Sequence, residues 1–360
     1  MPLRRKSRNA PCLRHSRRGS VVIFVLGIIL LAAFLITRLM DRAAVELAAE
    51  GKAAKRGDLR QEAVSALEAS LAVLADEAAA RSGLHDGSEG WDRPLALMDY
   101  QPTPGYTAET LVVDETGKLS LPVVDEETLR NFLTTIGCPA TALDRLVDSL
   151  LVWTKPDYLP VEGEADGATF ASAALPYAAP GRTLRSFAEL RAIPAARELF
   201  FDEQGEWNEL GRSFRTGASL FAFNASNVNS APSAVLLTRG LDEARVAAIM
   251  AAREDKNSRS SYFHSAAEMA GAWGRDATPP GLGTEALCLH VIVTVKFGSR
   301  QYRLDAWVQP AGASTPVARR PAETDKSANA AKPPASVRNN PRKSMDYPFR
   351  ILELRENDGT

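Results

Sequence analysis

The chain has 360 residues, 45% of them apolar, which is enough for one or two domains with hydrophobic cores plus tails. Its formal net charge is −1, but seven cations and no acid precede Ser20, and without them the charge falls to −8. So acidic a chain is a poor candidate for broad binding to a nucleic-acid backbone. The sequence has no Walker loop, no Gly-rich dinucleotide fingerprint, and neither a Gly-x-Ser-x-Gly nor a His-Glu-x-x-His motif, so we expect a protein that is not an enzyme.

An apolar helix is expected close to the N-terminus. Residues 20–37 contain no charge, and 18 residues are the lower limit for a helix that crosses a hydrocarbon layer of about 30 Å. The preceding cations predict that this end stays in the cytoplasm and that the rest is exported. Two alternatives stay open. One is a cleaved Sec signal peptide, although the apolar run is longer than an h-region of about 7–15 residues and lacks an Ala-x-Ala site; the other is a twin-arginine signal at Arg17 and Arg18.

The start of this helix resembles the type IV prepilin class. Gly19 lies directly between the basic leader and the apolar run. In that class a prepilin peptidase cuts after this glycine, which implies cleavage between Gly19 and Ser20, methylation of Ser20 and a helix that stays in the inner membrane. The class usually begins with Phe and has Glu at the fifth mature position, where this chain has Ser20 and Phe24. The resemblance implies a membrane and assembly helix that includes Phe24, Val25, Ile28 and Leu31.

Residues 38–81 are predicted to continue the helix beyond the apolar run. Ala, Glu, Leu and Arg are good helix formers and dominate this stretch. Gly51 and Gly57 weaken its middle and predict a bend or a break. A signal anchor followed by an unrelated helical linker would have the same composition, but it would not explain the position of Gly19. The apolar face of the predicted helix has helical spacing and consists of Val64, Leu67, Leu71 and Leu74.

Strand and helix signals follow in order. Residues 110–113 and 118–121 flank a Gly-containing turn and predict a β-hairpin. Helices are predicted over 127–136 and 142–153, and an acidic loop rich in Pro and Gly over 156–180. Strand signals return near the C-terminus, where 287–295 and 301–308 predict a second hairpin that joins the first in a sheet.

The composition changes after Pro310 to Pro, Ala, Ser, Lys and Arg, which is typical of disorder. We therefore predict a disordered tail over 311–360. The apolar patch at 347–354 within it is expected either to add a strand or to contact a partner.

Several segments together resemble the K-type minor pseudopilin of the type II secretion system. The resemblance runs from Arg17 to about Val308, and it depends on the order of the segments rather than on any one of them. Val152 departs from it, because the family often has Asp before the tryptophan. The segments are Asp114-Glu115-Thr116-Gly117-Lys118, Leu146 to Trp153, Ser186-Phe187-Ala188-Glu189-Leu190, and Asn227-Val228-Asn229-Ser230-Ala231-Pro232.

This resemblance implies an α+β fold in which a long pilin-like N-terminal helix packs on a small antiparallel sheet. A large all-α domain of two SAM-like or helix-hairpin-helix-like modules is inserted into that sheet. The implied partners are the I-type and J-type minor pseudopilins, the prepilin peptidase and the bacterial inner membrane, with the C-terminal domain in the periplasm. The implied role is a tip subunit that initiates and caps a pseudopilus for protein export. An unpaired carboxylate in a membrane is costly, so the missing acid at Phe24 favours a subunit with no neighbour at that end.

The predicted organisation divides the chain into seven parts. They are a prepilin leader (1–19), the transmembrane part of the helix (20–37), an amphipathic helix with its connection (38–85), the first strands (86–121), the inserted helical domain (122–285), the C-terminal strands (286–310) and the tail (311–360).

A membrane-anchored periplasmic binding module for DNA or an envelope partner is the alternative. The segment from Asn227 to Trp273 resembles helix-hairpin-helix modules, which bind phosphate at a Gly-rich hairpin and a helix N-terminus. This chain has only Gly240 there, and Asp242 and Glu243 in the next helical turn would repel a phosphate. We therefore expect the hairpin to serve packing and expect no nucleic acid as a partner.

The acidic loop raises the question of Ca²⁺, and no other cofactor is expected. Its carboxylates offer hard oxygen ligands, and the K-type family is associated with calcium, although the spacing is not that of an EF-hand. A solvated loop is the alternative. The candidate ligands are Asp157, Glu162, Glu164 and Asp166.

The two cysteines beyond the leader, Cys138 and Cys288, lack metal-binding spacing. They either pair in an oxidising periplasm or remain two separately buried thiols. The histidines His85, His264 and His290 also lack ligand spacing, and His290 is expected to be a satisfied or exposed residue of a strand.

Overall fold

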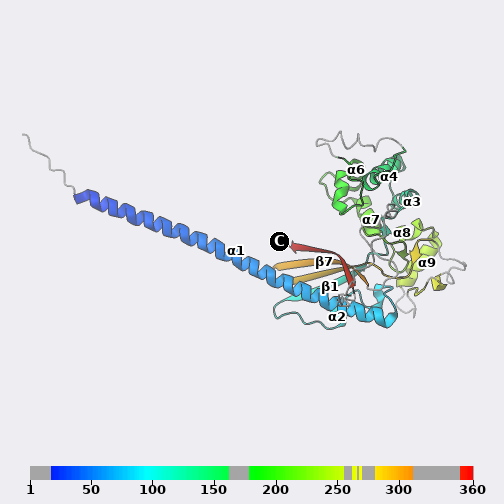
Figure 1. Cartoon of the computed structure of the whole chain (residues 1–360), viewed down its shortest axis with the longest axis horizontal. Coiled ribbons are helices and arrows are strands. Elements are labelled where there is room, and N and C mark those ends of the chain that lie inside the picture. Colours follow the sequence, from blue (N-terminus) through cyan, green and yellow to red (C-terminus); the bar gives the residue numbers. More distant parts are fainter. Residues whose placement is uncertain are drawn as a thin grey trace, which may run out of the picture. The chain divides into compact units, whose positions relative to one another are not determined.

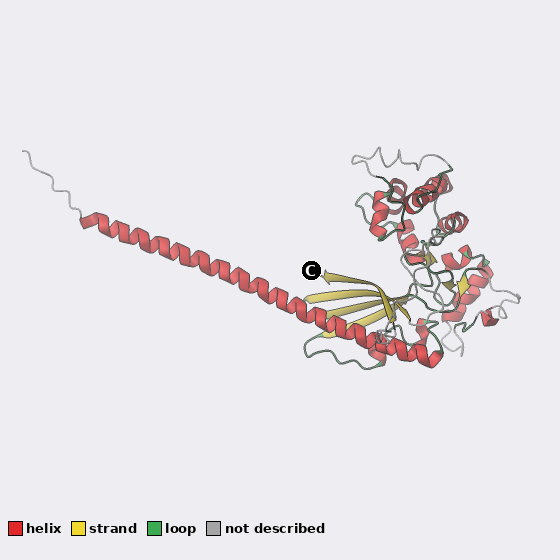
Figure 2. Ribbon diagram, viewed as in Figure 1, coloured by secondary structure: helices red, strands yellow, loops and turns green. Residues whose placement is uncertain are grey.

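The structure, a computed structural model, describes residues 18–161, 178–254, 262–265, 267–269, 280–310 and 349–359. The chain divides into two compact units, Met1–Asp58 and Leu59–Thr360. In the first unit the described residues belong to helix α1. The second unit contains the rest of α1, a sheet and a group of shorter helices (Figures 1 and 2).

Helix α1 extends over 64 residues, Arg18–Arg81. The predicted bend or break at Gly51 or Gly57 is wrong, because the helix continues through both. A glycine in a helix interior costs about 1 kcal/mol relative to Ala, which a run of Ala, Leu, Glu and Arg around it can offset. A Cβ atom at either position would have no neighbour within 4 Å, so packing does not require glycine there.

The second unit contains a four-stranded sheet in the order β1-β6-β7-β8. All neighbours in this sheet are antiparallel. The last part of α1 packs on one face, where Leu71 and Leu74 are fully buried together with Val291 and Val293. Residues along β6 alternate between buried and half-exposed, as expected for a sheet with one covered face. The strands are β1 (Thr107–Asp114), β6 (Leu289–Phe297), β7 (Arg300–Pro310) and β8 (Phe349–Gly359).

The predicted hairpin of 110–113 with 118–121 is wrong. β1 pairs with β6, whereas β2 (Leu119–Ser120) pairs in parallel with β3 (Ala218–Ser219). β6 offers β1 eight residue pairs and a matching alternation of buried side chains, which a two-residue strand cannot. The backbone N–H of Glu115 donates to the carbonyl of Cys288 at the end of this pairing, and the chain then enters the helical domain.

The second predicted hairpin is confirmed as β6 and β7, with Leu289 opposite Val308. The prediction of a disordered tail is wrong for residues 349–359, which form β8 along β7. Phe349 enters the sheet core with 3% of its surface exposed, and the ladder with β7 satisfies the backbone of the strand. The remainder of that predicted tail, 311–348, lies outside the described residues.

The helical domain is inserted between β1 and β6, as predicted, and has its own core. Phe132, Phe200 and Phe214 are fully buried there, with the rings of Phe200 and Phe214 stacked 4.7 Å apart. Two short parallel strand pairs, β2 with β3 and β4 (Ser226–Asn227) with β5 (Leu282–Gly283), supplement the expected helices. The helices are α3 (Glu126–Thr135), α4 (Ala140–Thr154), η2 (Phe187–Ala192), α6 (Pro194–Phe200), α7 (Glu209–Gly217), α8 (Ser233–Thr238) and α9 (Glu243–Glu254).

Local capping explains where several helices begin. The side chain of Asp125 accepts a hydrogen bond from the N–H of Thr128 at the start of α3. Ser186 does the same for Ala188 at the start of η2. The connection after α1 contains η1 (Gly87–Glu89), closed by a capping box of Asp86 and Glu89, and α2 (Pro94–Leu97).

Candidate functional site

The N-terminal half of α1 presents an apolar surface that no described part of the chain covers. The segment Val21–Glu46 has a mean hydropathy of 2.7 and is long enough to cross a membrane. A soluble protein rarely exposes so large an apolar patch, and a surface of this kind fits a membrane or partner helices. Phe24 is 69% exposed. The other predicted assembly residues on this exposed stretch are Val25, Ile28 and Leu31.

The predicted cleavage site lies at the beginning of this helix. Gly19 and Ser20 belong to the first turn of α1, and the rest of the predicted leader lies outside the described residues. Cleavage between them stays a prediction.

Two of the sequence segments meet at the junction of the sheet and the helical domain. Asp114, the last residue of β1, accepts hydrogen bonds from Ser230 Oγ at 2.5 Å and Asn227 Nδ2 at 2.7 Å, and from the N–H of Thr116 at 2.8 Å. Burial raises the pKa of the Asp114 carboxyl to about 6, although these hydrogen bonds act in the opposite direction. The junction is therefore built around a carboxyl group that accepts three hydrogen bonds.

Gly117 allows the two segments to approach. A Cβ atom there would lie 2.5 Å from Ser230 Oγ and 2.8 Å from the carbonyl carbon of Ser230. The N–H of Asn227 also donates to the carbonyl of Thr116 at 3.0 Å. Glycine is needed here because the backbone of the other segment lies so close. Its φ does not require glycine, since it lies outside the left-handed region.

The asparagines of the second segment extend the junction to other parts of the chain. Asn227 Nδ2 also donates to the carbonyl of His85, directly after α1. Asn229 exchanges hydrogen bonds with the backbone of Phe263, donating to its carbonyl and accepting from its N–H. Its Nδ2 donates in addition to the carbonyl of Thr284. Both asparagines are buried, so each satisfies backbone groups that water cannot reach.

The helix-hairpin-helix resemblance corresponds to a packing unit in this structure. Arg253 near the end of α9 donates to the carbonyls of Val228 and Ala231. Gly240 has a φ of +86° in the turn between α8 and α9, and the carboxylate of Asp242 accepts from the N–H of Arg245. The guanidinium of Arg253 and the backbone after the turn at Gly240 therefore make these hydrogen bonds within the helical domain itself.

Two further sequence segments also meet each other inside the helical domain. Trp153 Nε1 donates to Glu189 at 3.3 Å, and Arg182 pairs with the same carboxylate at 3.1 Å. Asp148, which is 1% exposed, accepts from Tyr158 Oη at 2.7 Å and from the N–H of Val161. These polar residues of the K-type pattern therefore order the start of the acidic loop.

A cluster around His85 was not anticipated from the sequence. His85 is buried, its ring is stacked on Tyr262 and contacts His264 edge-on. Glu89 accepts from Trp91 Nε1 at 2.7 Å and from the N–H of His85 at 3.0 Å. Burial works against ionisation, but these hydrogen bonds lower the pKa of Glu89 to about 2. A sequence signal existed in the Asp-x-x-Glu spacing of the capping box, from Asp86 to Glu89.

His290 is a satisfied histidine of a strand, as expected. Its Nε2 lies 2.8 Å from Asp305 Oδ1, and its ring is stacked 4.1 Å from that of Trp307. Burial opposes ionisation of Asp305, yet hydrogen bonds from His290 and Arg303 hold the pKa of that carboxyl below its ordinary value. These residues line a cavity of about 410 Å³ in which Lys118, Arg303 and Arg355 each pair with a carboxylate.

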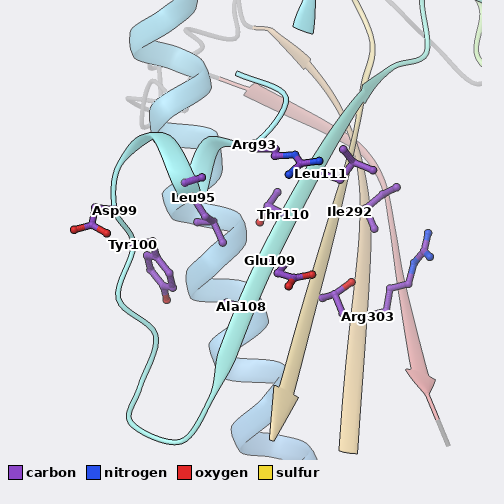
Figure 3. A pocket seen from close by; sticks show the side chains of 12 residues that line it. Arg93, Leu95, Asp99, Tyr100, Ala108, Glu109, Thr110, Leu111, Ile292 and Arg303 are labelled. Carbon is purple, nitrogen blue, oxygen red and sulfur yellow. The ribbon is translucent and has the colours of Figure 1, made fainter. Parts of the chain in front are cut away.

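A second cavity, of about 680 Å³, lies beside the edge strand β1 (Figure 3). Leu95 and Tyr100 come from the segment that precedes β1, and Ile292 and Arg303 come from β6 and β7. Acidic and basic side chains are mixed around this cavity, as is usual where the edge of a sheet faces solvent. Its charged lining residues are Arg93, Asp99, Glu109 and Arg303.

One of the four candidate calcium ligands lies within the described residues. Asp157 is exposed after α4, whereas Glu162, Glu164 and Asp166 lie outside the described residues. Among the residues that are described, no cluster of three or more His, Cys, Asp or Glu side chains is suited to a metal ion. Calcium binding stays a prediction, and calorimetric titration of the chain with Ca²⁺ tests it, since absence of heat at millimolar ion would contradict it.

The two cysteines are separate buried thiols. Cys138 belongs to the core of the helical domain, and Cys288 packs with Phe221 and Phe223. Burial raises the pKa of both thiols, which keeps them protonated and unreactive.

Comparisons with known proteins agree with this architecture. Residues 111–202 match the family model described as type II secretion system (T2SS), protein K. The fold is similar to a chain in the crystal structure of the GspK-GspI-GspJ complex from the enterotoxigenic Escherichia coli type 2 secretion system. The TM-score is 0.57 at 11% sequence identity, and the match covers 85% of this chain and 98% of that chain. The comparison with curated proteins gave no match.

A long helix on a small antiparallel sheet, continued towards the N-terminus as an apolar stretch long enough for a membrane, defines a pilin-like subunit. Most of the residues that match the family model lie in the inserted helical domain. Over residues 111–202 the chain is similar to protein K of the type II secretion system, and its fold is similar to that of a chain in a complex of GspK, GspI and GspJ.

Proposed function

We propose that this pseudopilin is the tip subunit of the filament and that its work is assembly rather than catalysis. The observation that carries the proposal is Phe24, an apolar residue at the fifth position after Gly19 on an exposed apolar helix. A subunit with no neighbour above it has no amine for a carboxylate at that position to pair with. An uncompensated charge there would be costly in a membrane.

The chain is anchored in the inner membrane by a single helix, with its C-terminal domain in the periplasm. The apolar stretch of α1 and the cations before it support this orientation. Prepilin peptidase removes the leader after Gly19 and leaves this helix attached to the mature chain.

I-type and J-type minor pseudopilins assemble with it through parallel packing of their N-terminal helices. Support comes from a solved complex in which GspK is named together with GspI and GspJ, because one chain of that complex has a similar fold. The helical domain contacts the connection after α1, where the ring of Tyr262 is stacked on His85. In a tip subunit, a large helical domain would leave growth of the filament to proceed from below.

The first test is the intact mass and N-terminal sequence of the protein recovered from membranes. A mature chain that begins at Ser20, with or without one added methyl group, is expected. Cleavage beyond the apolar helix, near Ala32 or later, would instead mean an ordinary exported protein.

A substitution at the cleavage site tests the link to secretion. Gly19→Val is expected to block both processing and export, because the residue before the cut is changed. Gly27→Val is the matched control within the same helix, where a Cβ atom would meet nothing within 4 Å. Normal processing and secretion by Gly19→Val would overturn the proposal.

A further inference from the structure

The edge strand β1 has backbone groups that point away from the sheet. In an antiparallel ladder, successive residues direct their N–H and C=O groups alternately toward the partner strand and away from it. The N–H of Val112 points away from β6, because it donates to the carbonyl of Asp92 at 2.8 Å. Thr110 and Ala108, two and four residues earlier in the same regular ladder, therefore direct theirs away from β6 as well. Among the described residues, no backbone hydrogen bond reaches Ala108 or Thr110 on that side.

The cavity of about 680 Å³ lies beside this open edge (Figure 3). The chain meets the edge at Asp92, leaves it through α2, and then returns to begin β1. Ala108 and Thr110 both line the cavity. The edge thus offers backbone partners to an extended peptide and a space for its side chains, as in binding by strand addition. The aliphatic lining of this space includes Leu95, Leu111 and Ile292.

The other edge of the sheet is less suited to pairing. Strand β8 has a register shift in its ladder with β7, and its charged residues include Glu353 and Arg355. Bulges and charges are devices by which edge strands avoid pairing with other chains. β1 has no register shift against β6, and Glu109 is the one charged residue in the range 107–113. Of the two edges, β1 is therefore the better template for an added strand.

Two opposite charges flank the open edge. Arg93 directly follows Asp92 and so lies near Val112, whereas Glu109 lies three residues before Val112, which is about 10 Å along a strand. Both side chains are exposed at the cavity, and within the described part of the chain neither forms an ion pair. A peptide with an acid and a cation three positions apart complements both charges. The other charged residues of the cavity have partners in the chain, Arg303 with Asp305 and Asp99 with Gln101.

We propose that the open edge of β1 binds an extended segment of a partner protein as a fifth strand of the sheet. The segment carries a carboxylate toward Arg93, a Lys or Arg toward Glu109, and aliphatic residues between them that fill the cavity. Its backbone pairs with the outward N–H and C=O groups of Ala108 and Thr110. An acid that precedes the cation gives a strand antiparallel to β1, and the reverse order gives a parallel one. This inference does not depend on the position of the subunit in the filament.

Binding of two synthetic octapeptides to the full-length protein in detergent micelles tests the proposal. Their cores are Glu-Val-Val-Lys and Lys-Val-Val-Glu between identical flanks of Ser and Thr, so their composition and net charge are the same. Valine is chosen because β-branched residues favour strands. Fluorescence anisotropy of a dye on the peptide measures the affinity. We expect one order of charges to bind about fivefold or more tightly than the other, since two ion pairs are gained or lost together.

A charge swap on the chain tests the two flanking residues. Arg93→Glu combined with Glu109→Arg is expected to reverse the preference between the two peptides, because both charges change sign and the backbone of the edge stays the same. Both side chains are exposed, so the substitutions leave the core of the sheet intact. A preference that the double variant keeps unchanged would overturn the proposal.

N-methylation of the peptide tests the backbone pairing. Successive N–H groups of an added strand face β1 and solvent in turn. A methyl group on the nitrogen of one valine should therefore weaken binding by about tenfold, because the N–H that it replaces is a donor to β1. The same methyl group on the other valine should have little effect, which makes it the matched control.

Ala108→Pro tests the same pairing from the side of the chain. Proline removes an N–H that points away from β6, so the ladder with β6 keeps its hydrogen bonds. Peptide binding should weaken by about tenfold, and Ala108→Ser, which keeps the N–H, should bind as the native chain does. If Ala108→Pro does not fold, the methylated peptides decide the result.

Three outcomes would overturn the proposal. They are equal affinity of the two octapeptides, equal affinity of the two N-methylated forms, and absence of binding at millimolar peptide. Self-association of the chain that Ala108→Pro abolishes, without binding of either peptide, would instead assign the edge to a second copy of this chain.

Discussion

At Gly117 the absence of one carbon atom allows the helical domain to contact the sheet. Backbone atoms of Ser230 and Ala231 occupy the space where a Cβ would be, at 2.8 and 2.9 Å. Backbone cannot rotate away as a side chain can, so any larger residue has to move one of the two segments.

Gly117→Ala is therefore expected to destabilise the protein by about 1–3 kcal/mol through overpacking. Urea unfolding followed by circular dichroism measures the change. The same substitution at Gly57, which has open space around it, is the control and should be neutral or stabilising by up to about 1 kcal/mol. Equal effects of the two substitutions would contradict the role given to Gly117.

The pKa of Glu89 is shifted in the opposite direction to that of Asp114. Its buried carboxylate is so well hydrogen-bonded, by His85 and Trp91 among others, that its pKa falls to about 2 despite desolvation. A depressed pKa contributes stability above the ordinary value of 4.5, and this contribution is lost as the pH falls through about 2.

Glu89→Gln should accordingly lower stability at pH 7 by about 1–3 kcal/mol, because buried donors lose a charged acceptor. The difference from the native chain should shrink when unfolding is measured below pH 3. Glu77→Gln is the control, since its pair with Arg81 is partly exposed and such pairs contribute about 0–1 kcal/mol. A pH-independent effect at Glu89 would show that the loss is one of packing.

At the scale of elements, β8 shows that a strand can follow a long stretch with the composition of a tail. The sequence before Phe349 is rich in Pro, Ala, Ser, Lys and Arg, and this composition led to the prediction of disorder. The strand itself has 11 residues, and its apolar residues acquire a role only beside β7. Its sequence allowed either a strand or a partner contact, and tertiary pairing selected the strand.

Phe349→Ala is expected to destabilise the sheet by about 3–5 kcal/mol, the usual range for loss of a buried aromatic ring. Thermal or urea unfolding measures this. Ile351→Ala in the same strand removes a side chain that is 46% exposed and should change stability by less than about 1 kcal/mol. If the two substitutions have the same small effect, β8 does not pack on the sheet as described.

The helices were the most predictable elements. The apolar spacing and caps placed α3 and α4 within a few residues of their observed ends, because each signal lies within one or two turns of the chain. The glycines of α1 misled the prediction, since propensity is a weak local preference that neighbouring helix formers override.

At the scale of the whole molecule, the apolar part of α1 and the folded unit beyond Leu59 perform different tasks. The helix segment is long and apolar enough to cross a membrane, and the folded unit contains a helical domain held to the sheet by polar contacts. Substitutions in α1 between Val21 and Met40 are thus expected to affect assembly more than the stability of the folded unit.

Phe24→Glu tests this separation. Without a partner amine, the new carboxylate should disfavour the membrane position by up to about 3 kcal/mol and reduce the amount of complex with I-type and J-type subunits. Co-purification from membranes measures the complex, and the unfolding of the unit from Leu59 onward should be unchanged. Phe24→Leu is the control that keeps the residue apolar. A yield of complex from Phe24→Glu equal to that of the native chain would contradict the absence of a neighbour at that end.

The sequence by itself determined the membrane-length helix, most of the helical segments, the second hairpin and the insertion of a helical domain between strand regions. These features depend on charge, periodicity and caps within a few turns, or on the order of segments along the chain. Only the tertiary structure decided that β1 pairs with β6, that β8 completes the sheet, and that Asp114 meets Ser230. The contacts of β1 with β6 and of Asp114 with Ser230 join residues more than a hundred positions apart, and those of β7 with β8 join residues 39 to 58 positions apart. Local preferences do not specify which of several compatible strands or polar groups will be brought together.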